Sequence, residues 1–365
     1  MKDLKELRLE INEIDEKMAK LFEKRMEVAS QIASYKLANG LNIFDAKREE
    51  EVISKNLAYI ENEKVKSYYV NFIKDVMEES KKYQSLIFNG LRIAYSGVPG
   101  AFGYIAAKKM YPDANYIAYP DFESAYKACE KGECDIVVLP IENSFAGDVG
   151  LVMDLIFQGT LKINKMFNLD VIQNLLGVKG ATKSSIKKVI SHPQALSQSL
   201  DYLKGQGYEL EESANTALAA LEVKNKNDIT LGAVASLETA ELYGLEVIES
   251  HINSSNTNST RFAALSRISR VPDADVKMGE HFILVYTVKN QAGALAETLN
   301  IIGSHGYNMR TVRSRPMKEL IWNYFFFVEV EGNINTQDGA DVLNELSTVC
   351  DRLKLAGTYY DFKDK

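Results

Sequence analysis

A chain of 365 residues is longer than a single hydrophobic core usually allows, so two or three domains are expected. Its 46% apolar and 25% charged residues are typical of a globular protein, and a net charge of −7 gives no support for binding nucleic acid or an anionic membrane. No apolar run or secretory pattern predicts a membrane span or a signal peptide. The three cysteines predict free thiols in a reducing cytoplasm, and four scattered histidines indicate no metal site.

The first 88 residues contain no proline and one glycine, Gly40, which predicts helices on both sides of it. Apolar residues of the first helix recur every three or four positions in a heptad-like seam: Leu4, Leu7, Ile11, Ile14, Met18, Leu21, Val28 and Ile32. Arg25 and Lys36 occupy positions of this seam, where a charge is costly unless it is paired or bound to a counter-ion. A snorkelling arginine, or an acidic partner from another helix, would account for them as well.

The next two predicted helices also place polar groups on faces that should be apolar. Asp45, Arg48 and Glu49 share one face of the second helix, and Ser80 and Gln84 continue the apolar stripe of the third. The same feature in three helices predicts an enclosed polar ligand.

Segment 1–88 resembles the all-helical chorismate mutase domain, which forms an intertwined dimer. The resemblance implies six catalytic and two further substrate-binding positions: Arg8, Arg25, Lys36, Arg48, Glu49 and Gln84, with Asp45 and Ser80. Arg8 lies about a hundred degrees around the helix from Arg25, and the equivalent arginine of the family reaches into the partner subunit's site. The implied reaction is the rearrangement of chorismate to prephenate, with the substrate held by oriented donors and without a cofactor.

From residue 90, strands alternate with helices over roughly 180 residues, which favours a doubly wound sheet or two lobes facing a cleft. The strand Leu91–Ser96 is followed by a turn with three glycines, whose N–H groups are suited to binding an anion. The turn is not the dinucleotide fingerprint, so no nicotinamide cofactor is expected.

The run Ile136–Leu139 predicts a buried strand that ends at Pro140, because proline cannot donate a ladder hydrogen bond. Glu142, Asn143 and Ser144 follow, at the end of a strand where open α/β sheets bind ligands. A polar turn with a serine cap would have the same sequence. Strands are also expected at 188–191, 228–235 and 262–265.

Three motifs in order, at 140–144, 191–194 and 260–262, resemble the prephenate dehydratase domain and the closely similar arogenate dehydratases. The resemblance implies a two-lobed α/β fold like that of periplasmic binding proteins, with the active site between the lobes. It implies that Thr260 protonates the departing hydroxyl as prephenate loses carbon dioxide, in a pocket poor in cations. The other implied pocket residues are Glu142, Asn143, Ser144, Gln194, Ser213, Thr216 and Arg261. Ala101 and Gly103 depart from the hydroxyl residues usual in the family.

Residues 278–365 predict the order βαββαβ of an α+β ferredoxin-like module. Two of its segments resemble the phenylalanine-binding motifs of the ACT domain: Gly293, Ala294 and Leu295, and Ser314, Arg315 and Pro316. The resemblance implies an L-phenylalanine effector, although Arg313 stands where the family usually has glutamate. A module that serves dimerisation alone would have the same pattern.

Together the resemblances imply three domains, 1–88, 90–268 and 278–365, in a cytoplasmic homodimer or dimer of dimers. The expected activity converts chorismate to prephenate and prephenate to phenylpyruvate, under feedback by phenylalanine, without cofactor, metal, nucleic acid or membrane. Two alternatives stay open: arogenate as the second substrate, and a catalytically weakened ligand-sensing protein.

Overall fold

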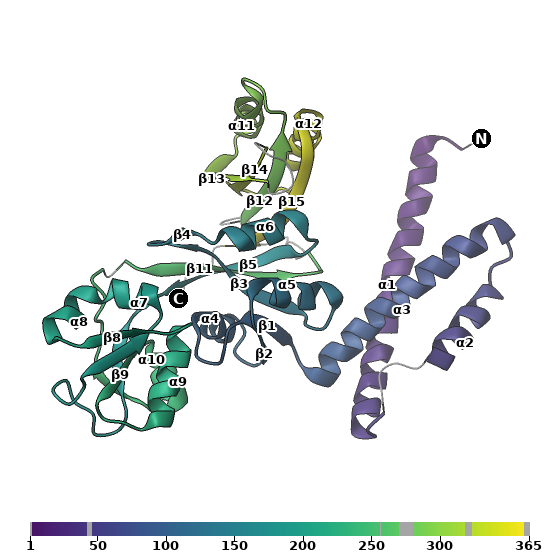
Figure 1. Ribbon diagram of the computed structural model, residues 1–365. Helices are drawn as coiled ribbons and strands as arrows, with labels where there is room; N and C mark the ends of the chain where they lie inside the picture. The colour runs from purple at the N-terminus through teal and green to yellow at the C-terminus, as the bar shows by residue number, and fades with distance from the viewer. Residues whose placement is uncertain (1, 42–45, 256, 270–279, 318–322, 361–365) are drawn as a thin grey trace. The chain divides into compact units, whose positions relative to one another are not determined.

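A computed structural model describes residues 2–41, 46–255, 257–269, 280–317 and 323–360. The chain divides into two compact units, Met1–Arg92 and Ile93–Lys365. Three helices form the first unit, α1 (Leu4–Ala38), α2 (Ala46–Leu57) and α3 (Glu63–Asn89) (Figure 1). A capping box of Asp3 and Glu6 starts α1, and the side chain of Asn62 caps α3. The predicted all-helical N-terminal domain is therefore confirmed.

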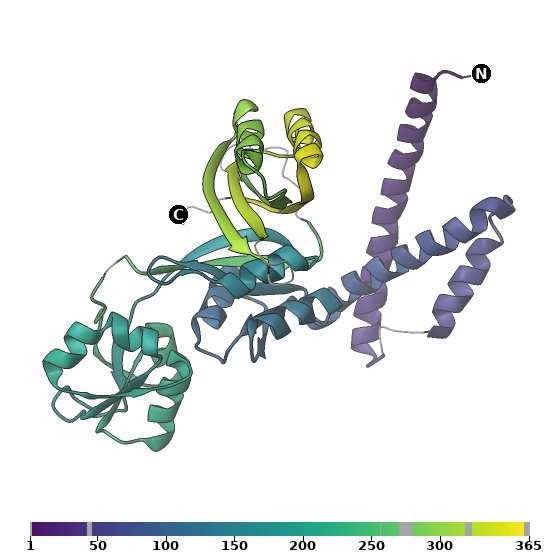
Figure 2. The same ribbon diagram turned by 45° about the horizontal axis from the view of Figure 1, so that its top comes forward.

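The apolar seam of α1 lies at the surface of the single chain. In both ribbon views the first half of α1 extends away from α2 and α3 (Figure 1, Figure 2). Leu7, Ile14 and Leu21 are 46%, 50% and 66% exposed, and Ala29 and Ala33 are the buried residues of this helix. The seam is thus helical, as predicted, but its side chains are not covered by α2 or α3.

The second unit begins with a lobe built on a mixed sheet. Its strands are β1 (Arg92–Ser96), β2 (Asn115–Tyr119), β3 (Ile136–Asn143), β4 (Gly147–Asp148), β5 (Lys162–Asp170) and β11 (Ser259–Ser266). Its helices are α4 (Phe102–Met110), α5 (Phe122–Lys131) and α6 (Gly150–Gln158). The strand order is β5-β11-β3-β1-β2, and the central position of β3 explains why Val137, Val138 and Leu139 are fully buried.

Strand β3 does not end at Pro140, so that prediction is wrong. Arg261 of β11 pairs with Glu142 and the next residue, Phe262, pairs with Pro140, which leaves Ile141 as the extra residue of a β-bulge. A bulge is one of the places where a sheet tolerates a proline. The strand therefore continues to Asn143 and pairs with β4.

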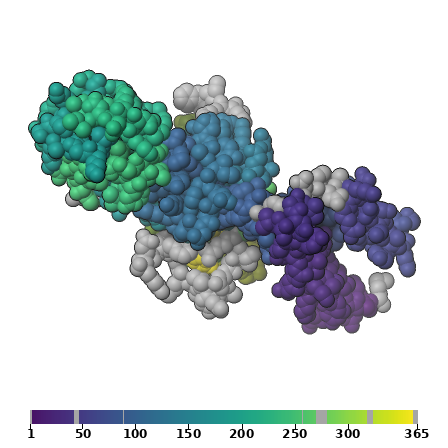
Figure 3. All heavy atoms as spheres, turned by 90° about the horizontal axis from the view of Figure 1, so that it is seen from below, coloured from purple at the N-terminus to yellow at the C-terminus, as the bar shows by residue number. Residues whose placement is uncertain are grey.

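The second lobe is a five-stranded sheet in the order β10-β6-β9-β7-β8, seen as a rounded green body in Figure 3. Its strands are β6 (Asn174–Gly177), β7 (Lys188–Ser191), β8 (Glu209–Glu212), β9 (Leu231–Ala235) and β10 (Glu246–Glu249). Its helices are α7 (Pro193–Gln198), α8 (Leu200–Gln206), α9 (Thr216–Lys226) and α10 (Leu237–Tyr243). Two chain crossings join the lobes, and they are tied together where Val171 N donates to Asn258 O at 2.8 Å and Ile252 N to Gln173 O at 2.9 Å.

The C-terminal module has the predicted βαββαβ order. Its elements are β12 (Glu280–Val288), α11 (Ala294–Ser304), β13 (Asn308–Pro316), β14 (Tyr324–Glu331), α12 (Gln337–Val349) and β15 (Cys350–Tyr360). The four strands lie in the ferredoxin-like order β13-β14-β12-β15, and both helices cover one face of the sheet (Figure 1, Figure 2). The three predicted fold classes are thereby confirmed.

The sheet of this module is continuous with the sheet of the first lobe, because strands β15 and β5 pair at one position. Gly357 of β15 pairs in parallel with Ile163 of β5, so the two sheets become one of ten strands. A Cβ atom on Gly357 would collide with the backbone of Ile163. No helix among the described residues has the length and apolar character of a membrane span.

Candidate active sites

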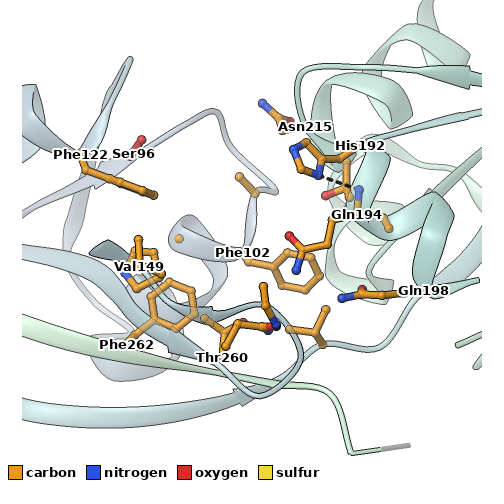
Figure 4. A pocket seen from close by; sticks show the side chains of 18 of the residues that line it. Ser96, Phe102, Phe122, Val149, His192, Gln194, Gln198, Asn215, Thr260 and Phe262 are labelled. Atoms are coloured by element: carbon orange, nitrogen blue, oxygen red, sulfur yellow. Dashed lines mark hydrogen bonds between the residues drawn. The ribbon is translucent and has the colours of Figure 1, made fainter. Parts of the chain in front are cut away.

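A cavity of about 460 Å³ lies between the two lobes, beyond the carboxyl ends of β1 and β3. Phe102, Phe122, Val149 and Phe262 give the first lobe's side of it an apolar surface (Figure 4). The second lobe contributes polar side chains, listed from the start of α7 to the start of α9: His192, Gln194, Gln198, Asn215 and Thr216. The cavity therefore combines an apolar first-lobe surface, interrupted by Ser96, Asn143 and Thr260, with an amide-rich surface from the second lobe.

Thr260 lines the cavity, and its hydroxyl is held by Asn143. The Asn143 Nδ2 atom donates to Thr260 Oγ1 at 2.8 Å, while Asn143 Oδ1 accepts from the N–H groups of Phe145 and Ala146 at 3.0 and 2.8 Å. These two backbone donors fix which end of the amide is oxygen. Thr260 Oγ1 consequently acts as an acceptor toward Asn143, and its own proton is available to a molecule in the cavity.

The second lobe presents Gln194 and Thr216 to the same cavity. Figure 4 shows the Gln194 amide extending from α7 into the space opposite Phe102. His192 caps α7 by accepting from Gln194 N on Nδ1 at 3.2 Å, and Asn215 caps α9 by accepting from Leu218 N at 2.8 Å. The caps fix where α7 and α9 begin, and Gln194 and Thr216, in the first turn of each helix, line the cavity.

Four residues predicted for this pocket do not line it, and strand geometry is the main reason. Successive residues of a strand point to opposite faces, so Glu142 and Arg261 face away when their neighbours Asn143 and Thr260 face the cavity. Ser144 instead ties β3 to the loop before β11, donating to Thr257 O at 2.9 Å and accepting from Ser259 N at 3.0 Å. Ser213 also lies outside the lining, where Ala214 and Asn215 stand instead.

Arg261 is committed to the C-terminal module. Its two terminal nitrogens bind the Glu329 carboxylate at 2.5 and 2.6 Å, and one of them also donates to Tyr359 at 2.6 Å. Burial alone would lower the pKa of Arg261, but these hydrogen bonds and the charge of Glu329 raise it. The same contacts hold the pKa of Glu329 below its usual range although burial acts to raise it. The predicted pocket cation is therefore a buried ion pair.

Cations are absent from the described cavity lining, in which Asp148 is the one acidic residue, and its carboxylate binds Arg313 of the C-terminal module at 3.0 Å. The N-termini of α4 and α6 open on the cavity instead, at Ala101 and Val149, and neither helix has a side-chain cap. Uncapped N–H groups and the helix dipole favour a bound anion there. Ala101 and Gly103 both line this region and present a methyl group and a bare Cα to it.

Several lining residues have no counterpart among the predicted ones. Gln173 and Gln198 come from the chain crossing and from α7, and Gln173 Nε2 lies 3.4 Å from Gln198 Oε1. The Gln173 Oε1 atom is buried and has no partner among the described residues. Gln173 follows β5 and belongs to no recognisable sequence motif, so its place in the cavity could not be predicted from the local sequence. Phe102 and Phe262, by contrast, stand inside motifs that the sequence made conspicuous.

In the helical unit, the structure brings Arg25 and Ser80 together across α1 and α3. Arg25 Nη1 contacts Ser80 Oγ and lies 3.3 Å from Val76 O, and burial lowers the pKa of Arg25. Gln84 lies one turn beyond Ser80, and its Oε1 is buried without a partner in the described part of the chain. These three residues form a partly buried polar group where an apolar stripe is expected.

The remaining predicted residues of this unit are less closely gathered. Glu49 binds Lys81 at 3.0 Å, Arg48 binds Glu51 at 3.2 Å, and Lys36 is half-buried. Asp45 lies outside the described residues. Arg8 is exposed, and by helix geometry it lies about 25 Å along α1 from Arg25. One chain therefore does not bring Arg8 to the Arg25 group.

The residues predicted to bind an effector fall into two groups. Gly293 begins α11 with a φ of 86°, and Ala294 and Leu295 line a cavity of about 120 Å³ beside Tyr324. Ser314 and Pro316 lie exposed on β13, and Arg315 binds Asp154 of α6 at 2.9 Å. Arg315 is thus tied to the first lobe rather than to the α11 cavity.

Comparison with known proteins identifies three successive family models. Residues 7–85 match chorismate mutase type II, residues 93–270 match prephenate dehydratase, and residues 281–348 match the ACT domain. A bifunctional chorismate mutase/prephenate dehydratase of Aquifex aeolicus is 29% identical over 98% of both chains. An arogenate dehydratase/prephenate dehydratase of Arabidopsis thaliana is 30% identical over 74% of this chain and 72% of its own.

Among solved structures, the prephenate dehydratase of Staphylococcus aureus is 26% identical and superposes with a TM-score of 0.64. That match covers 74% of this chain and 100% of the other. Together with the order of elements and the cavity between the lobes, these matches place the chain in the prephenate dehydratase family, in its bifunctional form with a chorismate mutase segment and an ACT domain.

Proposed function

We propose that the chain rearranges chorismate to prephenate in its helical unit and converts prephenate to phenylpyruvate in the cavity between its lobes. The observation that carries the second activity is the Thr260 hydroxyl, which faces the cavity and accepts a hydrogen bond from Asn143. A hydroxyl held in this way has its proton free for a leaving group. The supporting observation for the first activity is the partly buried Arg25, Ser80 and Gln84 group.

In the dehydratase step, prephenate loses its ring carboxylate as carbon dioxide and its ring hydroxyl as water, and the ring becomes aromatic. Thr260 donates the proton that the departing hydroxyl needs, and Asn143 stabilises the charge that develops on Thr260 Oγ1. Water then restores the proton to Thr260. Both roles require that Asn143 Nδ2 donates to Thr260 Oγ1 and that the Thr260 proton points into the cavity.

The scarcity of cations suits the decarboxylation. A cation beside the ring carboxylate would stabilise the ground state, because the negative charge leaves that carboxylate as carbon dioxide forms. The N-termini of α4 and α6 hold the pyruvyl carboxylate, which keeps its charge throughout the reaction. Gln194 and Thr216 complete the polar contacts, and Phe102 and Phe262 pack on the ring.

In the mutase step, no bond to the protein is needed, since the rearrangement is concerted. Arg25 binds one substrate carboxylate through its planar guanidinium group, and Lys36 and Gln84 donate to the ether oxygen. Glu49 accepts from the ring hydroxyl, Arg48 and Ser80 line the site, and Arg8 comes from the partner subunit. The exposed apolar seam of α1 supports a homodimer or dimer of dimers, in which a second copy covers these side chains.

A variant of the seam tests the dimer. Ile14→Glu introduces a charge where a partner helix would pack, so sedimentation should show loss of the oligomer or its rearrangement, together with loss of mutase activity. Glu16→Ala, on the opposite side of α1, is the matched control and should leave both unchanged. An Ile14→Glu protein with unaltered assembly and full mutase activity would contradict the proposal.

The C-terminal module is proposed to bind L-phenylalanine and to inhibit the dehydratase. The left-handed Gly293 at the start of α11 exposes backbone N–H groups beside the small cavity next to Tyr324, which suits an amino-acid carboxylate.

The three cysteines are free thiols in the structure, which supports the reducing cytoplasm as the proposed location.

One assay tests the whole proposal: conversion of chorismate to phenylpyruvate with and without added L-phenylalanine. Thr260→Ala should lower dehydratase kcat by about 10²- to 10⁴-fold, as expected for loss of a general acid, whereas Thr260→Ser should retain more activity. Prephenate should then accumulate from chorismate. A ligand-sensing protein would bind prephenate without consuming it, so inactive wild-type protein would overturn the proposal.

Arogenate is the second candidate substrate, because the Arabidopsis relative is named for both dehydratase activities. Arogenate differs from prephenate by an amino group in place of the keto oxygen. The two substrates are distinguished by their kcat/KM values measured on the same protein. A higher value for arogenate would make it the substrate of the second activity.

A further inference from the structure

Strands β3 and β11 present one pair of residues to the cavity and the neighbouring pair to the ACT module. Asn143 pairs with Thr260 across the two strands, and Glu142 pairs with Arg261. Asn143 and Thr260 line the cavity, whereas Glu142 meets Arg313 at 2.5 Å and Arg261 meets Glu329 at 2.5 Å. The two strands that carry Asn143 and Thr260 on their cavity face therefore form ion pairs with the ACT module on their opposite face.

Arg313 reaches both strands of the β3–β4 hairpin. Besides Glu142 it binds Asp148, at 3.0 Å, and these two carboxylates face each other directly across the hairpin. Like charges that face each other across a strand pair destabilise the pairing. The Arg313 side chain is 12% exposed, so its charge is screened little by water. Arg313 thus compensates the like charges of Glu142 and Asp148, whose side chains are 34% and 36% exposed.

The shape of the hairpin determines the direction of the Asn143 amide. The hairpin residues Phe145 and Ala146 donate to Asn143 Oδ1, which turns Nδ2 toward Thr260. Ala146 and Asp148 also form part of the cavity surface. A displaced hairpin would therefore change both the Thr260 contact and the wall next to it.

We propose that Arg313, a residue of the ACT module, is a positioning residue of the dehydratase site. It holds Glu142 and Asp148 together, so that Asn143 keeps its hydrogen bond to Thr260. The inference rests on the proposed dehydratase activity.

The test compares dehydratase kcat and KM for Arg313→Ala, Arg313→Lys and the double variant Arg313→Ala/Glu142→Gln. Arg313→Ala should lower kcat by about tenfold or more with a smaller change in KM, as misplacement of a reacting group does. Arg313→Lys keeps the charge and should retain more activity. The double variant removes the repulsion and should recover part of the kcat that Arg313→Ala loses.

Arg352→Ala is the matched control. This arginine also joins the ACT module to the first lobe, but it donates to Phe157 O at the end of α6, at 3.0 Å, away from the hairpin. Its removal should leave kcat within about twofold, since α6 keeps its contacts with Lys354. Thermal unfolding of each sample, compared with wild type, reports that the second unit has folded.

Three results would overturn the inference: unchanged kcat in Arg313→Ala, an equal loss in Arg352→Ala, or a double variant worse than Arg313→Ala. If Arg313→Ala does not fold, an Arg313→Gln protein that folds and keeps the wild-type kcat without the charge overturns it as well. Wild-type protein without dehydratase turnover would instead refute the proposed function, so the two failures are distinguishable.

Discussion

The side-chain amide of Asn143 lies 2.8 Å from the hydroxyl of Thr260, across the paired strands β3 and β11. The direction of this hydrogen bond has a chemical consequence. Because Asn143 donates, Thr260 keeps its proton for the cavity. A group at position 143 that accepts would reverse the bond and draw the Thr260 proton away from the substrate.

Asn143→Asp is expected to lower dehydratase kcat by about 100-fold or more, the usual effect of removing one stabilising donor. The aspartate still accepts from Phe145 N and Ala146 N, which preserves the turn. It loses the donor that binds Asn258 Oδ1 and Ser259 O at 3.0 and 3.1 Å, so the thermal unfolding temperature should fall as well. Steady-state kinetics with prephenate checks the first point, and thermal unfolding the second.

The double variant Asn143→Asp/Thr260→Ala provides the control. If Asn143 acts through Thr260, the double variant should be no worse than Thr260→Ala alone. Additive losses would mean that Asn143 contributes independently, and a fully active Asn143→Asp protein would refute the role assigned to its donor.

Strand alternation explains which site residues could be predicted from the sequence. Motif resemblance selected Asn143, Gln194, Thr216 and Thr260, and all four line the cavity. It also selected Glu142, the neighbour of Asn143, although two successive strand residues face opposite sides. Motifs mark a stretch of chain, whereas the register of β3 against β11 decides which residues of the stretch meet the ligand.

Long-range contacts explain the rest of the differences. The helices and strands of the ACT module follow from local periodicity, so its order was predictable. The extension of β3 past Pro140 depends on a bulge in its pairing with β11, and the pairing of Arg261 with Glu329 joins residues 68 positions apart. Neither the bulge nor the ion pair can be predicted from local sequence patterns.

A second prediction concerns the independence of the two activities. Arg25→Ala should abolish mutase activity, because it removes the guanidinium group that contacts Ser80. Dehydration of added prephenate should remain largely intact, since its cavity lies wholly within the second unit. Both activities are measured on one sample with chorismate and with prephenate as separate substrates.

The dehydratase activity thus controls for folding of the second unit, and helical circular dichroism compared with wild type controls for folding of the first. Retention of mutase activity in Arg25→Ala would remove Arg25 from the site. Loss of both activities, in a sample that unfolds like the wild type, would show that the two sites are coupled rather than independent.

A third prediction concerns the pH dependence of stability. Glu329 is fully buried, and Arg261 and Tyr359 hold its pKa below the ordinary value of 4.5 although burial acts in the opposite direction. The folded state therefore binds this proton less readily than the unfolded state. The stabilisation is complete well above pH 4.5 and is lost as the pH falls through the lowered pKa.

Glu329→Gln should therefore be less stable than wild type at pH 7, by about 3 kcal/mol or more, because it leaves Arg261 buried without a counter-charge. The difference should shrink as the pH falls below 4.5, as denaturant unfolding at several pH values would reveal. Glu331→Gln, on the same strand but 46% exposed, is the control and should change stability by less than about 1 kcal/mol. A difference that stays constant with pH would contradict the assigned shift.

The last prediction concerns the junction between the ACT module and the first lobe. Gly357→Ala would place a Cβ atom against the backbone of Ile163, where β15 and β5 meet. The strands must then separate locally, which should cost about 1–3 kcal/mol of unfolding free energy. Because β5 also borders β11, which carries Thr260, dehydratase kcat should fall as well.

Gly303→Ala is the matched control, since a Cβ atom on this glycine of α11 meets open space. Replacing a helical glycine there should be neutral or stabilising by up to about 1 kcal/mol. Thermal unfolding and prephenate turnover of the two variants separate the general effect of adding a methyl group from the specific clash at the junction. If Gly357→Ala is as stable and as active as Gly303→Ala, the backbone approach of β15 to β5 does not contribute to holding the ACT module on the dehydratase.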